Sequence, residues 1–586
     1  MKLIGQYIVK YKKLFITGLL LKLLATVLEL LIPYVMEHII DTVALSGDLR
    51  KVILWGAGMI LLAIATWRIS LKANNVAIRM SSRATYDIRQ ELFVHTIRLS
   101  GDQFDDFSLP SLTSRMTSDS YNVQNFLRGA QTMGIRAPIM LVGGIIITMT
   151  MDMGLSLILC VLAPIMIVII VTISRMGVPL YDKVQDKLDR IVCIMRENIT
   201  GIRVVKSLSK EDYERRRYGD ANEDMTRADR KASIVMALPG PLMTLALNIG
   251  LTLVVIIGAR RVNDGLTEPG VILAFLTYFN MIMMGVMGLN RIFMSLSKAS
   301  ASADRIQTVI RKPNQLAPVP ADGMPAPPSD DYIIFDDVTF GYGDDDDDDD
   351  DERFDGEERQ NSLDNITFSI KKGGSLGIIG ATGSGKTTVI NLLMRFYDTD
   401  EGHIYVDGRD VRTYVPEELR SKFGVVFQND LVFAMSLADN IAFGRNVDRA
   451  EVANAAQEAQ AAGFIEEYED GYDHMSEIRG ANFSGGQKQR ILISRALAGD
   501  PDILILDDAS SALDYRTDAE LRKAIRENHS SATSIVIAQR ISSIMSLDAI
   551  MVLDDGKMIG YGTHEELMES CPPYVEIFKT QMGGEE

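Results

Sequence analysis

The sequence predicts an α-helical membrane domain with six transmembrane helices, followed by an α/β domain that carries a phosphate-binding loop. Three observations support this fold class. Apolar stretches are concentrated in the first half of the 586-residue chain, although 24% of all residues are charged. After residue 331, short β-type runs alternate with helical stretches. A glycine-rich loop, GATGSGKT, lies between one of these runs and a helix.

Six apolar segments can be read before the β-type runs begin. They cover residues 14–40, 52–71, 133–151, 155–173, 234–258 and 271–293. Each is near or above the ~20 residues that a helix needs to cross a bilayer. The basic N-terminus, with Lys2, Lys10, Lys12 and Lys13, predicts that this end is cytoplasmic. An even number of spans then places the C-terminus there too, and the long apolar run favours a retained anchor over a cleaved signal peptide.

The domain boundaries follow from changes in composition. Residues 1–311 form the predicted membrane domain, in which two long charged loops, 72–132 and 174–233, extend membrane helices into the cytoplasm. Residues 312–331 are rich in proline and alanine and predict a linker. Residues 332–586 predict a mostly parallel sheet with an antiparallel flank.

Charge and cysteine content exclude some classes of protein. The formal net charge is −18, but segment 344–358 alone contains twelve acidic residues and one arginine, which leaves about −7 for the remainder. This balance argues against a nucleic-acid-binding protein. The segment includes eight consecutive aspartates, for which we predict a solvated insert rather than a cation-binding loop. Three scattered cysteines indicate neither a metal site nor a disulfide framework.

The glycine-rich loop predicts a binding site for ATP and Mg²⁺. Its backbone N–H groups can surround phosphates at the start of a helix. Lys386 can reach the β- and γ-phosphates, and Thr387 can bind Mg²⁺ together with Asp507, which ends a buried strand, and Gln428. Tyr342 can stack on adenine, although a surface tyrosine is the alternative. The other predicted ATP-binding residues of the loop are Gly380, Thr382, Gly383, Ser384, Gly385 and Thr388.

A second glycine-containing helix start, NFSGGQKQR, lies further along the chain. Here Ser484, Gly485 and Gly486 form an anion-binding helix start that we expect to point away from the chain's own phosphate loop. With the phosphate loop, the glutamine at 428 and the SALD turn at 511–514, this order of motifs resembles an ATP-binding-cassette (ABC) ATPase. The six spans resemble the membrane half of a type I ABC exporter. Segments 109–124 and 198–214 look like those that carry its first and second coupling helices.

The resemblance implies that two such chains close head to tail. Each ATP then lies between one chain's phosphate loop and the other chain's signature, here Ser484, Gly485, Gly486 and Gln487, with Asp514 nearby. The family's catalytic glutamate is replaced by Asp508, which is one methylene, or about 1.5 Å, shorter. Gln539 stands where the family has a histidine. Residues 476–480 read SEIRG where exporters often read close to VGERG, which leaves open how this cassette signals to the membrane helices.

These departures are similar to the degenerate-site subunit of heterodimeric bacterial multidrug exporters. The resemblance implies a second half-transporter as partner, a bacterial cell membrane as location, and low hydrolysis at this chain's own site of an ATP-driven translocase. The alternatives are a homodimeric exporter or flippase with slow ATPase activity, and a nucleotide-gated regulator that transports nothing.

Polar residues inside the spans predict a pathway for an amphipathic, drug-like or lipid-like substrate. Asn280, Met284, Met287 and Arg291 recur on one face of the sixth span, and Glu29 lies in the first. Arg68 in the second span is a candidate partner for Glu29. The alternatives are that the methionines fill gaps between helices and that Arg291 extends toward the membrane surface.

Overall fold

The computed structural model describes residues 1–343 and 361–582, so the predicted acidic insert, 344–358, lies outside the described residues. The chain divides into two compact units. The helical unit comprises Met1–Ile97 and Pro110–Lys312, and the sheet unit comprises Arg98–Leu109 and Pro313–Glu586. The short segment Arg98–Leu109 therefore belongs with the sheets, although it comes from the predicted membrane half.

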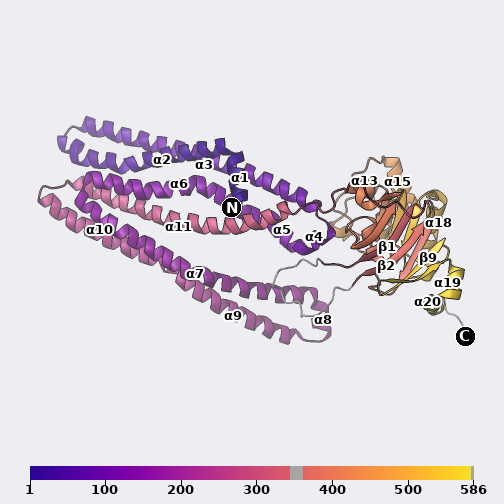
Figure 1. Cartoon of the computed structure of the whole chain (residues 1–586). Coiled ribbons are helices and arrows are strands. Elements are labelled where there is room, and N and C mark those ends of the chain that lie inside the picture. The colour runs from indigo at the N-terminus through magenta and orange to yellow at the C-terminus, as the bar shows by residue number, and fades with distance from the viewer. Residues whose placement is uncertain (344–360, 583–586) are drawn as a thin grey trace. The chain divides into compact units, whose positions relative to one another are not determined.

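The helical unit confirms the six predicted spans (Figure 1). Its helices are α1 (Lys2–Lys10), α2 (Lys12–His38), α3 (Leu49–Ile97), α5 (Leu109–Ser114), α6 (Ser120–Met151), α7 (Met153–Thr200), α8 (Ile202–Ser207), α9 (Glu211–Ala237), α10 (Pro239–Asn263) and α11 (Pro269–Arg311). The 49 residues of α3 correspond to about 74 Å of helix, far more than the ~30 Å of a bilayer core. The membrane helices thus continue well beyond the apolar segments, as the charged loops predicted.

Between α6 and α7 the chain turns sharply at Asp152. Its carboxylate accepts hydrogen bonds from the N–H groups of Gly154 and Leu155, which caps α7, and from Arg261 Nε at 2.9 Å. The cap satisfies helix N–H groups that have no intrahelical partner. Arg261 lies in the last turn of α10, so this ion pair ties two helix ends together.

The sheet unit contains two sheets. Four strands pair in the order β2-β1-β4-β5, and six in the order β10-β9-β3-β8-β7-β6. The strands are β1 (Ile333–Phe340), β2 (Leu363–Ile370), β3 (Ser375–Gly380), β4 (Glu401–Val406), β5 (Arg409–Asp410), β6 (Phe423–Val426), β7 (Ile503–Asp507), β8 (Thr533–Ile537), β9 (Ala549–Asp554) and β10 (Lys557–Gly562). In the larger sheet β3 and β6–β9 run parallel, and β10 is antiparallel to β9. The predicted parallel sheet with an antiparallel flank is therefore present.

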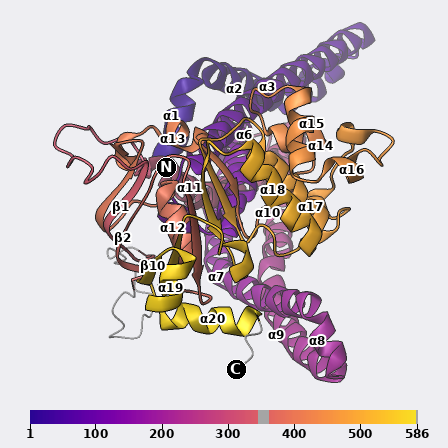
Figure 2. The same ribbon diagram turned by 90° about the vertical axis from the view of Figure 1, so that its right-hand side faces the viewer.

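Helices surround the sheets. They are α12 (Lys386–Leu393), α13 (Pro416–Ser421), α14 (Leu437–Ala442), α15 (Arg449–Glu458), α16 (Ala462–Ile465), α17 (Gly485–Leu497), α18 (Tyr515–Asn528), α19 (His564–Ser570) and α20 (Pro572–Met582). The C-terminal helix α19 packs against β10, and α20 packs against α19 (Figure 2). The β7 run ILILD is buried on both sides, which explains its unbroken apolar sequence and places Asp507 at the end of a rigid strand.

A further short helix of the sheet unit, α4 (Gly101–Phe107), comes from the predicted membrane half. Its first N–H, from Gly101, donates to the Phe396 carbonyl at 2.8 Å, and Tyr397 Oη donates to Asp105 at 2.9 Å. A Cβ on Gly101 would fall 2.2 Å from the Tyr397 ring, so only glycine allows this approach. The resemblance placed the first coupling helix at 109–124; α4, which packs within the sheet unit, directly precedes that segment.

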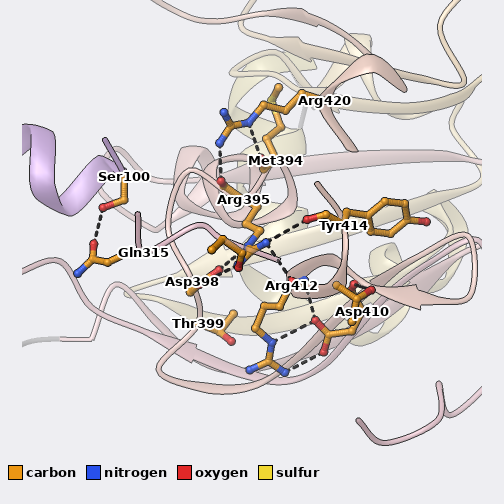
Figure 3. Close-up of polar contacts among 12 residues, drawn as sticks. Ser100, Gln315, Met394, Arg395, Asp398, Thr399, Asp410, Arg412, Tyr414 and Arg420 are labelled. Carbon is orange, nitrogen blue, oxygen red and sulfur yellow. Dashed lines mark hydrogen bonds and ion pairs between the residues drawn. The ribbon is translucent and has the colours of Figure 1, made fainter. Parts of the chain in front are cut away.

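A buried arginine after α12 fastens the linker to the smaller sheet (Figure 3). The side chain of Arg395 is 0% exposed and pairs with Asp398 at 2.8 Å. It also donates to the backbone carbonyls of Arg412, Tyr414 and Ala317. One guanidinium therefore bonds the linker at Ala317 and the segment after β5 at Arg412 and Tyr414. Arg395 itself follows α12, so it connects these three parts of the sheet unit.

Replacing Arg395 with methionine is expected to destabilise the sheet unit by about 3–5 kcal/mol, since it leaves a carboxylate and several carbonyls without their donor. Differential scanning calorimetry of the purified chain should show one unfolding transition several degrees lower. Arg516→Met is the matched control, because the Arg516–Glu520 pair is exposed and such pairs contribute about 0–1 kcal/mol. Equal shifts for the two variants would contradict this role for Arg395.

Candidate nucleotide site

The loop between β3 and α12 has the backbone that a phosphate cradle needs. Gly383 and Gly385 adopt φ of 86° and 94°, a region that favours glycine. A Cβ on Gly380 would lie 2.1 Å from the Leu553 carbonyl oxygen, and one on Gly385 would lie 2.5 Å from that of Ser362. Glycine is thus required for packing as well as for conformation, and the loop ends at the N-terminus of α12, where helix N–H groups attract anions.

Lys386 and Thr387 begin α12 and face the end of β7. Lys386 Nζ donates to the carbonyls of Gly380 at 2.9 Å and Ala381 at 2.6 Å, so the loop itself holds the amine. Thr387 Oγ1 donates to Asp507 Oδ2 at 3.1 Å. Burial lowers the pKa of Lys386. Burial also raises the pKa of Asp507, with a further contribution from the neighbouring Asp508 carboxylate.

These residues line one cavity of about 600 Å³. The predicted residues that it brings together are Tyr342, Gly380, Thr382, Gly383, Gly385, Lys386, Thr387, Thr388, Gln428, Asp507, Asp508 and Gln539. A hydroxyl, a carboxylate and an amide oxygen on Thr387, Asp507 and Gln428 are the hard oxygen donors that Mg²⁺ prefers. Asp507 is only 2% exposed, and a cation there would offset the burial of its charge. The donor set therefore fits a magnesium nucleotide.

Tyr342 is held at the rim of this cavity. Its hydroxyl donates to Thr388 Oγ1 at 3.2 Å and accepts a hydrogen bond from Asn391 at 3.1 Å. The edge of Tyr397 packs against its ring at a centroid distance of 5.1 Å. Tyr342 remains 40% exposed, so part of it is free for stacking. Because Tyr397 also bonds Asp105 of α4, the same aromatic pair reaches the segment that comes from the membrane half.

Asp508 and Gln539, the two residues that depart from the family pattern, are bonded to each other. Gln539 Nε2 donates to Asp508 Oδ2 at 3.0 Å. The Asp508 backbone is fixed on both sides: its N–H donates to the Ile537 carbonyl of β8, and its carbonyl accepts from Gln489 Nε2 of α17. Burial raises the pKa of the Asp508 carboxyl, while Arg540 and Lys386 act in the opposite direction. A short carboxylate whose oxygen is already bonded to an amide is a poor base for an attacking water.

The signature residues lie elsewhere. Among the residues that the structure describes, the lining of the 600 Å³ cavity does not include residues 484–487 or Asp514. Ser484 caps α17: its hydroxyl accepts from the N–H of Gln487, whose side chain in turn accepts from the N–H of Ser484. Asp514 caps α18 by accepting from the N–H of Thr517. Ser384 of the phosphate loop also does not line the cavity; its side chain is buried beneath the loop near Lys386 Nζ.

Sequence reasoning missed part of the lining. The cavity is also lined by residues that were not predicted, namely Ser362, Ile379, Ala381, Ile537, Ile577 and Gln581. Gln581, in the C-terminal helix α20, donates to the Gln539 carbonyl and accepts from the Ile541 N–H, both at 2.7 Å. Helix α20 thereby holds the loop after β8 in place. No local motif marks Gln581, because its role depends on how α20 folds back.

The predicted substrate residues are only partly brought together in the helical unit. Met287 and Arg291 line a cavity of about 240 Å³ with Ile170, Pro239, Met243, Asn290 and Met294. Asn280 donates to the Leu276 carbonyl of its own helix, and Met284 is exposed. Neither is among the residues that line this cavity.

The suggested pairing of Glu29 with Arg68 is wrong. Glu29 Oε1 accepts a hydrogen bond from Arg136 of α6 at 2.7 Å. Arg68 instead lies over the ring of Trp67, next to it in the sequence, at 5.5 Å. The reason is that α6 packs on α2 as α3 does, and it offers a guanidinium at the right position on the facing helix.

Two protein-family models match this chain, one mainly in the helical unit and one in the sheet unit. The model of the ABC transporter transmembrane region matches residues 15–287, and the ABC transporter model matches residues 363–511. YfiB of Bacillus subtilis is 33% identical over 581 residues, which cover 99% of this chain and 98% of YfiB. Rv1273c of Mycobacterium tuberculosis is 33% identical over 583 residues, with coverage of 99% and 98%. Both are described as uncharacterized ABC transporter ATP-binding proteins.

A solved structure resembles the whole chain. The structure of a bacterial Atm1-family ABC exporter with ATP bound superposes with a TM-score of 0.80 at 25% sequence identity. The match covers 98% of this chain and 99% of that one. Helical unit and sheet unit are therefore both part of the similarity.

Proposed function

Because this chain belongs to the ABC transporter family and is a half-transporter with an exporter fold, we propose that it is the degenerate-site subunit of a heterodimeric exporter. In this proposal its own site binds ATP and Mg²⁺ firmly and hydrolyses ATP slowly. Its signature completes the active site of a partner half-transporter, and the pair moves an amphipathic, drug-like or lipid-like substrate out of a bacterial cell.

The observation that carries the proposal is the Asp508–Gln539 hydrogen bond inside an otherwise complete nucleotide cavity. Lys386, Thr387 and Asp507 would hold the nucleotide, with Tyr342 stacked on its base. Bound Mg²⁺ would neutralise phosphate charge there. Losing an effective general base commonly lowers the rate by 10²–10⁴-fold, while the phosphate contacts that give affinity remain.

The start of α17 supports the proposal that the signature binds the ATP held by the partner's phosphate loop. The first N–H groups of a helix have no intrahelical partner, and Gly485 and Gly486 leave them accessible to an anion. These groups do not line the cavity of the phosphate loop in the described chain. A second half-transporter would supply the phosphate that they bind.

The test is ATP hydrolysis by the purified chain. Alone, it is expected to turn over at least about 100-fold more slowly than the complex isolated with its partner, although it binds a fluorescent ATP analogue with similar affinity. Phosphate release measures turnover, and equilibrium titration measures binding. Brisk hydrolysis by the chain alone, together with ATP-driven dye uptake into inverted vesicles, would refute the subunit assignment in favour of a homodimer.

A further inference from the structure

A basic cavity of about 370 Å³ lies between α2, α3 and α6 of the helical unit. We define this basic pocket by its lining residues, which are Lys22, Asn74, Ile78, Arg128, Thr132, Met133 and Arg136. Three of the seven are cations. The volume lies within the range of cavities that hold small ligands.

The protein pairs only one of the three cations of the basic pocket with a carboxylate, in the part of the chain that the structure describes. Arg136 pairs with Glu29. Lys22 Nζ contacts only the neutral oxygens of Ser70 at 2.9 Å and Asn74 at 3.4 Å among its hydrogen-bond partners. Arg128 donates to the neutral amide of Asn125 at 3.0 Å. In the described part of the chain, therefore, neither Lys22 nor Arg128 forms an ion pair with a carboxylate.

Burial makes this imbalance significant. Lys22 is only 7% exposed and lies within a candidate membrane span, where an unpaired charge is unfavourable and marks a functional site by default. Arg136 Nε is also buried without an acceptor. Lysine and arginine side chains that converge on one cavity with unused N–H donors are suited to an anion. Ile78 and Met133 add apolar lining, and methionine adapts to different apolar shapes.

We propose that the basic pocket binds the anionic head of an amphipathic molecule, with Lys22 and Arg128 as the principal contacts and Arg136 oriented by Glu29. The proposal deepens the exporter function, on which it rests for the physiological role of the ligand: the exported amphiphile would carry a phosphate, sulfonate or carboxylate group. The bound anionic group would belong either to a cargo molecule or to a membrane lipid with an anionic headgroup.

The experiment compares two dyes with the same rings. Anilinonaphthalene sulfonate is an anion, and phenylnaphthylamine lacks the sulfonate. Both are titrated by fluorescence into the detergent-solubilised full chain without nucleotide, with empty micelles subtracted. Lys22→Gln, which keeps a donor for Ser70, and Arg128→Gln, at an exposed position, should each weaken sulfonate binding about tenfold or more. Binding of phenylnaphthylamine should not change.

Two controls make the result specific. Lys22→Arg should restore sulfonate binding, and Lys13→Met, an exposed lysine on the same helix outside the pocket, should leave it at the wild-type level. Displacement by both inorganic phosphate and short-chain phosphatidylglycerol supports recognition of the charge alone. Displacement by phosphatidylglycerol only supports a lipid-like amphiphile.

Unchanged sulfonate affinity in both glutamine variants would overturn the anion site, as would an equal loss for the two dyes. Because nucleotide is absent, that outcome would leave the exporter assignment intact. Conversely, failure of ATP-driven transport would leave an observed sulfonate site intact.

Discussion

Ser484→Arg is expected to abolish most ATP hydrolysis by the complex of this chain with its partner, whereas Asp508→Ala should leave it nearly unchanged. The hydroxyl of Ser484 caps α17, and small residues follow it, so a bound phosphate can approach the helix N-terminus. Arginine removes the cap and fills that space. Loss of one preorganised donor to a transition state costs about 10²–10³-fold in rate, and here several donors are blocked together.

Asp508 is expected to behave differently because, in the proposed function, it belongs to the site that contributes little turnover. Its removal deletes the hydrogen bond from Gln539 but leaves Lys386, Thr387 and Asp507 in place. Phosphate release by the complex, purified through a tag on this chain, measures both variants. Thr563→Arg is the matched control, since Thr563 forms the same kind of capping box on α19 and does not line the nucleotide cavity. A large loss with Asp508→Ala would mean that the two sites are assigned in reverse.

The parts of the fold that the sequence predicts well are those specified by local pattern. Apolar length identifies each membrane span without knowledge of its neighbours. The phosphate loop is similarly local, because strand, glycines and helix all lie within the single segment Ser375–Leu393. The buried run of β7 likewise locates Asp507 from composition alone.

Contacts between distant segments could not be predicted in this way. Glu29 and Arg136 are 107 positions apart, and only the packing of α2 on α6 shows that Arg136, not Arg68, is the partner. Gln581 reaches the loop after β8 from α20, 42 positions further along the sequence. The position of α4 is a third example, since a glycine that allows a tyrosine ring to approach carries no motif.

The hydrogen bond between Asp508 and Gln539 could not be predicted from the sequence. Each substitution was visible as a departure from a family pattern, but their contact was not, since 31 positions separate them. The structure shows that the amide of Gln539 donates to one oxygen of the Asp508 carboxylate. In the proposed function a reacting water would need that carboxylate, so the two changes should be reversed together.

Changing Asp508 to glutamate and Gln539 to histidine together is expected to raise ATP hydrolysis by the isolated chain by about 10²–10⁴-fold. Glutamate extends the carboxylate by about 1.5 Å into the cavity, and histidine no longer presents a primary amide to it. Two copies of the chain would then pair repaired sites with intact signatures. Asp508→Glu alone should give a smaller gain, because the Gln539 amide remains near the carboxylate.

Phosphate release by the purified double variant measures the gain, and light scattering with ATP reports whether two copies associate. Adding Lys386→Ala to the double variant should remove the gain, since the phosphate contacts are lost while the repaired pair remains. If two copies associate and hydrolysis still does not rise, side-chain length and the amide contact are not what limits this site. The slow step would then lie outside the pair, and the loop that Gln581 holds after β8 would be the next place to alter.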